Sequence, residues 1–378
     1  MNGATGLPRT PISRRGLLSA GAGLTAAVAL AACTPAAEPP ASGGPRQPAA
    51  RIDPGPVYRA SDGFLYAPDG SLFTPVGANV GTTGTFDWKG DSRGHAADAV
   101  AWGWNTVRLN LMVTAAHSWS FVAQRGTEDL LALVDQVVQE YTDAGIVVIL
   151  SAHDDPRAEG VDRRATEAGL AAWWTQAATR FAGNPRVWYG LLNEPDYTND
   201  EWVALMDGLA AAVRGTGNTS PVLLGASCWG QDVAGTRPYF ADARFGYEAT
   251  MAPAIAARHE NVIFEQHNYG AYGLYASQEK WGAYLEKVRD AGLTPLIGEF
   301  GYTVAKKDSP DIYDANYDAA QAVFELAAER HVGALWWHGT HGDNYSVMAD
   351  GGPFWKGRDG AGLSDGGRRL WQFGHGER

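Results

Sequence analysis

Short apolar runs with the length of buried β-strands recur along the chain from residue 73 onward. There are eight of them, at residues 73–79, 106–110, 146–153, 187–193, 222–226, 262–267, 295–299 and 333–337. Longer stretches with the length of helices lie between and after them, at residues 95–102, 128–144, 166–181, 200–214, 254–259, 278–291, 312–329 and 368–373. Alternation of this kind predicts parallel strands that are joined by crossover helices.

The second helical stretch shows the pattern clearly, because its apolar residues recur at spacings of three and four. They are Leu130, Leu131, Val134, Val137, Val138 and Tyr141. Eight strand–helix repeats over this length predict an α/β fold in one domain, a single (β/α)8 TIM barrel. The alternative is a doubly wound open sheet, which requires a glycine-rich phosphate loop after its first strand. Residues 77–81, Gly-Ala-Asn-Val-Gly, match that loop poorly.

Two Asp-Gly pairs stand before or beside the first strand, at Asp62-Gly63 and Asp69-Gly70. Asp-Gly between short apolar runs is typical of a tight turn that joins two antiparallel strands. We therefore expect a small N-terminal hairpin within residues 62–73. Its position in the chain suggests that it closes the floor of the barrel.

The first 50 residues have the features of an export signal and a linker. Residues 13–18, Ser-Arg-Arg-Gly-Leu-Leu, match a twin-arginine signal, and the weakly apolar segment after them is too short for a stable membrane span. The signal ends in Leu-Ala-Ala-Cys, which resembles a bacterial lipobox with Cys33 as the lipidated first residue of the mature protein. The alternative is an ordinary cleaved signal with a chance cysteine. Residues 33–50 are rich in Pro and Ala and predict a flexible tether.

These features divide the chain into a signal peptide at 1–32, a tether at 33–50 and a folded domain at 51–378. We expect an exported protein that is either a cell-surface lipoprotein or secreted. It would touch the membrane only through a lipid on Cys33. Cys228 is the one other cysteine of the sequence, so a mature chain that carries its lipid on Cys33 cannot form an intrachain disulfide.

Composition narrows the classes of partner. The chain is 45% hydrophobic and 19% charged, which suits a large buried core. Its formal net charge of −12 would repel nucleic acid, so we expect no nucleic-acid partner. We also expect a monomer. The 14 tryptophans and 15 tyrosines would suit sugar faces as well as a protein core.

Polar and aromatic residues end most of the strand-like runs. In a (β/α)8 barrel the active site lies at the carboxyl ends of the strands, so these residues are the ones to examine. They are Arg108, His153, Asn193, Glu194, His267, Tyr269, Glu299, Trp336 and Trp337. Each alone has a plain explanation as an ion-pair partner, a capping residue or a packed ring. Their convergence on one face of the barrel instead predicts a site with two carboxylates, as glycosidic cleavage requires.

The same residues resemble glycoside hydrolase family five, the cellulase and mannanase family of the retaining (β/α)8 clan. The specific motifs are Asn193-Glu194-Pro195 and the Gly-Glu-Phe-Gly of residues 298–301. Supporting matches are Arg108 in a Val-Arg-Leu context, His153 after the third strand, and the His-x-Tyr of residues 267–269. The likeness extends from about residue 62 to the C-terminus. It implies that residues 51–378 form a catalytic domain.

The resemblance and the chemistry imply a role for each carboxylate. Glu194 would be the general acid and then the general base, and Glu299 the nucleophile, with the two carboxyls about 5–5.5 Å apart. Arg108 and Tyr269 would favour the charged form of Glu299. Burial beside that negative charge would keep Glu194 protonated near neutral pH.

The remaining matched residues would bind or orient the sugar. Asn193 would hold the sugar 2-hydroxyl, His267 would tune Glu194, and His153 would bind the ring before the cleaved bond. The family has a tryptophan on the eighth strand, which matches Trp336 or Trp337. Strand alternation lets only one of the two face the sugar, and we favour Trp336.

The substrate class follows from the resemblance alone. Residues 224–232 and 261–264 look most like bacterial mannanases, which favours β-1,4-mannan and makes Trp229 a candidate stacking residue. A cellulase or other β-glucanase, an exo-acting β-glycosidase and a transglycosylase are the alternatives. A surface lipoprotein that only binds glycans would have no reason to keep both carboxylates. We expect no cofactor and no metal, because the mechanism needs none. Residues 338–343 include the residue types of a metal site, but their spacing matches no such site, which favours a substrate-facing loop.

Overall fold

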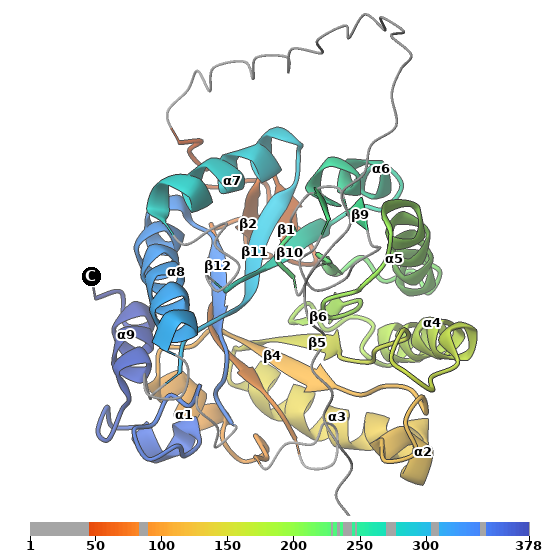
Figure 1. Cartoon of the computed structure of the whole chain (residues 1–378), viewed down its shortest axis with the longest axis horizontal. Coiled ribbons are helices and arrows are strands. Elements are labelled where there is room, and N and C mark those ends of the chain that lie inside the picture. Colours follow the sequence, from red (N-terminus) through yellow and green to blue (C-terminus); the bar gives the residue numbers. More distant parts are fainter. Residues whose placement is uncertain are drawn as a thin grey trace, which may run out of the picture. The chain divides into compact units, whose positions relative to one another are not determined.

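The computed structural model describes residues 45–82, 90–227, 230–232, 235–236, 244–245, 248–269, 277–303, 310–340 and 345–377. Within these residues, eight parallel strands close into a barrel in the order β10-β11-β12-β3-β4-β5-β6-β7 (Figure 1). The strands are β3 (Val76–Val80), β4 (Thr106–Leu111), β5 (Val147–Ala152), β6 (Val187–Gly190), β7 (Val222–Gly225), β10 (Val262–Asn268), β11 (Thr294–Phe300) and β12 (Gly333–Trp336). All eight predicted strands and the single barrel are confirmed.

Helices surround the strands in Figure 1 and cover the outside of the barrel. They are α1 (Ala96–Ala101), α3 (Thr127–Asp143), α4 (Arg163–Arg180), α5 (Asn199–Arg214), α6 (Ala252–Ala256), α7 (Gln278–Asp290), α8 (Pro310–Arg330) and α9 (Asp365–Gly374). Each matches a predicted helix, and the apolar stripe of α3 is fully buried. The short helix α2 (Phe121–Arg125) was not predicted, because five residues are too few to show a period. No described helix is long and apolar enough to cross a membrane.

Two short antiparallel pairs lie outside the barrel sheet. One is an N-terminal hairpin, as predicted, formed by β1 (Arg59–Ser61) and β2 (Phe64–Tyr66), although β1 lies just before the predicted range of residues 62–73. Its turn is Asp62-Gly63, with both residues at positive φ. The second Asp-Gly pair makes the next turn and brings Leu72 opposite Tyr66. The other pair, β8 (Gly235–Thr236) with β9 (Arg244–Phe245), was not predicted.

The hairpin closes the amino-terminal end of the barrel, as expected from the sequence. Tyr58 and Leu65 pack against inward-facing apolar residues of six barrel strands. These are Val147, Ile149, Trp188, Leu223, Ile263, Leu296 and Leu335. We call these nine residues the floor cluster. The predictions that concern Cys33, Cys228 and Trp229 fall outside the described residues.

Candidate active site at the carboxyl ends of the strands

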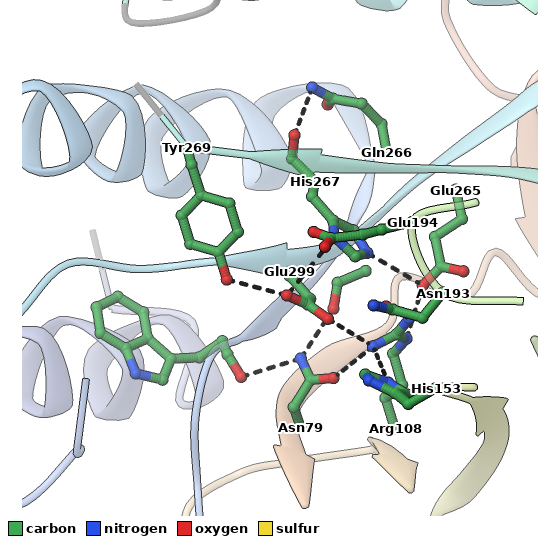
Figure 2. Close-up of polar contacts among 12 residues, drawn as sticks. Asn79, Arg108, His153, Asn193, Glu194, Glu265, Gln266, His267, Tyr269 and Glu299 are labelled. Carbon is green, nitrogen blue, oxygen red and sulfur yellow. Dashed lines mark hydrogen bonds and ion pairs between the residues drawn. The ribbon is translucent and has the colours of Figure 1, made fainter. Parts of the chain in front are cut away.

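Arg108, in the middle of β4, lies at the centre of a polar network inside the barrel (Figure 2). Its side chain is completely buried. Nη1 donates to Oδ1 of Asn79 and to Oε1 of Glu299, both at 2.9 Å, and lies 3.2 Å from Nε2 of His153. Nη2 donates to Oδ1 of Asn193 at 2.7 Å. One guanidinium therefore links β4 to β3 and β11 and to residues just beyond the ends of β5 and β6, and a planar group with five donors suits this arrangement.

The two candidate carboxylates face each other beside this network (Figure 2). Glu194 follows β6 in a turn and has φ of 44°, a left-handed conformation that costs a non-glycine residue about 1–3 kcal/mol. Glu299 lies near the end of β11. One oxygen of each carboxylate and one nitrogen of His267 all lie within 4.8 Å of one another. The structure therefore brings the two predicted glutamates within the range of a single bond that is being cleaved.

An irregularity in β11 turns Glu299 toward the inside of the barrel. Leu296 faces the floor cluster, so simple alternation would place Glu299 on the outer face of the strand. The pairing of β11 with both neighbouring strands shifts register around Gly298 and Glu299. An extra residue of this kind, a β-bulge, re-aims the side chain next to it and is common beside active sites.

His267 and Tyr269 contact carboxylate oxygens of Glu194 and Glu299. Nδ1 of His267 is 2.7 Å from Oε1 of Glu194 and 3.5 Å from Oε2 of Glu299. The Tyr269 hydroxyl donates to Oε2 of Glu299 at 3.1 Å. Both oxygens of Glu299 are thus engaged, one by Arg108 and the other by Tyr269. This fixes the orientation of its carboxyl plane.

The charges of the site change the proton affinities of its members. Burial raises the pKa of Glu299 to about 7, and the nearby charge of Glu194 adds to the rise while His267 and Arg108 oppose it. Although burial opposes a charge on His267, Glu299 and the bonds to Glu194 and Glu265 raise its pKa to about 9. His267 is therefore a cation near neutral pH. Two carboxyl groups this close titrate as a pair, so the pair retains a proton up to near pH 7.

Burial is distributed differently from our expectation. From the sequence we expected burial beside the negative charge of Glu299 to keep Glu194 protonated. In the structure 24% of the Glu194 side chain is exposed, against 5% for Glu299. Glu194 stands at the open side of the site because its turn lies beyond the end of β6. The proton of the pair is thus retained through burial of Glu299 and its repulsion by Glu194, not through burial of Glu194.

The preference for Trp336 as the ring that faces the sugar is wrong. Trp336 is 1% exposed and packs between Phe300 and Phe324 in the core outside the barrel. Its neighbour Trp337 is partly exposed, and its ring lies nearly parallel to that of His153, with centroids 6.2 Å apart. Leu335 faces the floor cluster, so alternation turns Trp336 outward and Trp337 inward.

Two members of the network were not predicted. Asn79, at the end of the first apolar run, accepts from Arg108 and donates to the Gly298 carbonyl at 2.8 Å. Glu265, inside the sixth run, lies 2.7 Å from Nε of Arg108. A signal existed for Glu265, because an acidic residue within a buried apolar strand needs a charged partner. It stands two residues before His267 and so on the same face of the strand.

Comparisons with known proteins agree with this geometry. The sequence profile of the family described as Cellulase (glycosyl hydrolase family 5) matches residues 74–343. The chain is 26% identical over 296 residues to a mannan endo-1,4-beta-mannosidase of Streptomyces lividans, an alignment that covers 77% of this chain and 69% of the relative. It is 24% identical over 287 residues to a beta-mannanase/endoglucanase A of Caldicellulosiruptor saccharolyticus, covering 75% of this chain but only 19% of that longer relative.

The fold also recurs among solved structures. A beta-mannanase from Streptomyces thermolilacinus superimposes with a TM-score of 0.64 at 23% sequence identity, covering 84% of this chain and 95% of that chain. The catalytic domain of a mannanase from Streptomyces sp. SirexAA-E gives a TM-score of 0.62 at 23% identity, covering 89% and 96%. At this level of identity the likeness concerns the barrel fold.

Proposed function

The chain belongs to the cellulase family, glycosyl hydrolase family 5, and from that membership we propose that it cleaves β-1,4-mannan with retention of configuration. In this proposal Glu194 is the general acid and base, and Glu299 is the nucleophile. The observation that carries it is the spacing of the two carboxylates, whose nearest oxygens lie within 4.8 Å. Retaining glycosidases hold their carboxyl groups about 5–5.5 Å apart, whereas inverting enzymes need about 6.5–9.5 Å to admit a water.

The proposed reaction has two displacements. In the first, an oxygen of Glu299 bonds to the anomeric carbon while the proton of Glu194 passes to the departing glycosidic oxygen. In the second, the Glu194 carboxylate takes a proton from water, and the hydroxyl oxygen replaces Glu299 on the anomeric carbon. Two inversions at one carbon return the β configuration. A single proton on the carboxyl pair is the starting state that this sequence needs.

The neighbouring residues support these roles. Arg108 and Tyr269 donate to the two oxygens of Glu299, which favours its charged form for attack. His267 contacts Glu194 and would steady that carboxyl as it gives up and regains a proton. Asn193, held by Arg108, would meet the sugar 2-hydroxyl. Trp337, beside His153, is the ring that would face the sugar.

We favour mannan over other β-glycans because both relatives described above are named as mannan-cleaving enzymes. One of those names also includes an endoglucanase, so a β-glucan is the second candidate substrate. The test is product analysis on mannan, glucomannan, cellulose, xylan and aryl glycosides. Rapid release of oligosaccharides from mannan, with little from cellulose, would support the proposal and reveal endo or exo action. Turnover of cellulose alone would replace mannan by β-glucan, and longer products would indicate transglycosylation.

We also propose that the mature protein is a lipoprotein attached through Cys33. The support is the twin-arginine signal, the Leu-Ala-Ala-Cys sequence and the Pro- and Ala-rich tether that follows. The Cys33→Ser variant should leave the membrane fraction, whereas Cys228→Ser, the matched control, should stay in it. Membrane attachment that survives Cys33→Ser would overturn this part of the proposal.

A further inference from the structure

Glu265 is a third carboxylate of the site, and neither proposed chemical step uses it. It lies in the middle of β10 and is 1% exposed. One oxygen, Oε1, is 2.7 Å from Nε of Arg108 and 3.8 Å from Nε2 of His267. Although burial opposes a charge there, Arg108 and His267 lower the pKa of Glu265. An ionised carboxylate in a barrel interior costs several kcal/mol unless it is paired in this way.

The neighbouring strand leaves room for this carboxylate. A Cβ atom at Gly298 would lie only 1.9 Å from Oε1 of Glu265, so a larger residue there would force the Glu265 side chain out of its position. Gly298 directly precedes Glu299, at the bulge that turns Glu299 inward. The same short segment of β11 thus leaves space for Glu265 and turns Glu299 inward.

We propose that Glu265 is a positioning residue that holds Arg108 and His267 in the orientations in which they meet Glu299 and Glu194. Glu265 would contact Arg108 and His267 on the sides of these cations that face away from the substrate. Its charge compensates the cation of His267 through Nε2, while Nδ1 is left to serve Glu194. The inference rests on the proposed function for the meaning of Glu194 and Glu299, but the contacts of Glu265 do not depend on it.

The charges around His267 explain why a third carboxylate is useful. Glu194, Glu265 and Glu299 face the imidazole from three different strands or their ends, and all three favour its cation. Arg108 and His153 stand on the other side of Glu299, and His153 stays neutral because burial and Arg108 hold its pKa well below 6.5. During the proposed reaction Glu299 becomes a neutral ester. Glu265 is then the carboxylate that still supports the His267 cation whichever state Glu194 is in.

The test is the Glu265→Gln variant, which keeps the shape of the side chain and removes its charge. Ring-nitrogen NMR of His267 should show both nitrogens protonated up to about pH 9 in the native protein, and loss of that proton at clearly lower pH in the variant. On mannan, kcat should fall by about 10²-fold while KM changes little, because misplaced catalytic groups weaken the transition state more than binding.

Asp207→Asn is the matched control. Asp207 bridges Nε of Arg258 and Nε2 of His259, each at 2.8 Å, which is the same kind of contact outside the barrel. That variant should leave both the His267 titration and kcat unchanged. Glu265→Asp keeps the charge but withdraws it from the imidazole, so it should give an intermediate titration and an intermediate kcat. It also replaces Glu265→Gln if the latter fails to fold.

An unchanged His267 titration in Glu265→Gln, or in Glu265→Asp where only that variant folds, would overturn the proposal. Glu265 would then serve packing alone. This outcome is distinct from failure of the proposed function, because the titration can be followed whether or not Glu194 and Glu299 perform the chemistry. A shifted titration with unchanged kcat would also overturn it, because the orientation of His267 would then not matter for turnover.

Discussion

The two ends of the barrel are built from the same strands but have opposite character. β10 contributes Ile263 to the floor cluster and, further along, Glu265 and His267 to the polar network. β11 contributes Leu296 to the floor cluster and Glu299 to the network. The position of a residue along its strand, rather than the strand it belongs to, decides between packing and chemistry.

This difference separates stabilising from functional contacts. At the floor, Trp188 packs edge to face on Tyr58 and Phe73, with ring centroids 5.4 and 6.0 Å apart. Contacts of this kind release water from apolar surface and stabilise the fold. At the other end, buried charges such as Arg108 and Glu265 are costly even when paired. The floor and the outer core must therefore supply the stability that lets these charges stay together.

The largest effect should come from Glu299→Gln. We expect activity on mannan to fall by at least about 10⁴-fold, because a covalent mechanism has no substitute for its nucleophile. The amide has nearly the same shape as the carboxyl, so the far-ultraviolet circular dichroism spectrum and sugar binding should change little. Near-native turnover by a purified variant would remove Glu299 from the reaction.

The next effect should come from Glu194→Ala and should depend on the leaving group. Loss of a general acid costs about 10²–10⁴-fold, and the loss should be largest for mannan, whose leaving group needs a proton. Activated aryl glycosides need little protonation and should form the glycosyl-enzyme nearly normally. Added azide should then speed their turnover by attacking the intermediate where water is no longer activated. An equal loss on both substrates would contradict the acid/base role.

At the floor, Leu296→Ala should lower the stability of the fold and leave activity nearly unchanged. Leu296 lies on the same strand as Glu299, three residues earlier, and is fully buried. Removing a buried leucine side chain lowers the free energy of unfolding by about 2–5 kcal/mol. Urea denaturation would measure that loss, while kcat/KM per folded molecule should stay within a few-fold of native. If kcat/KM falls as far as in the Glu194 variant, the two ends are not independent.

The sequence was sufficient to predict the helices and strands of the barrel and most residues of the polar network, because the carboxyl ends of all barrel strands lie on one face. It was not sufficient for the direction of side chains near those exits. Both faces of a barrel strand are buried, so an apolar run such as residues 333–337 does not reveal that Trp337, and not Trp336, points inward. In β11, likewise, the sequence does not reveal the bulge at Gly298, which turns Glu299 inward. Glu265 was missed because it stands inside a run and not at its end.

The smallest and most diagnostic effect concerns pH. If the reaction needs one proton on the carboxyl pair, kcat/KM on mannan should fall as pH rises through about 7, where the pair loses that proton later than an ordinary glutamate would. It should also fall at low pH, where the pair binds a second proton and Glu299 is no longer ionised for attack. The two limits belong to the coupled pair. An alkaline limb near the usual pKa of glutamate would mean that burial does not govern Glu299.

Loss of the same proton should also lower stability. The folded pKa of Glu299 is raised above its ordinary 4.5, so the folded state binds this proton more tightly than the unfolded chain does. Its contribution to stability is therefore complete below about pH 4.5 and is lost as pH rises through about 7. Urea denaturation of the native protein and of Glu299→Gln across this range isolates the contribution, because other groups titrate in both. The difference in unfolding free energy, native minus variant, should decrease over the same pH range in which kcat/KM of the native protein falls. A difference that stays constant would show that the carboxylate is already ionised at the acid end, and that Arg108 and His267 outweigh burial at this end of the barrel.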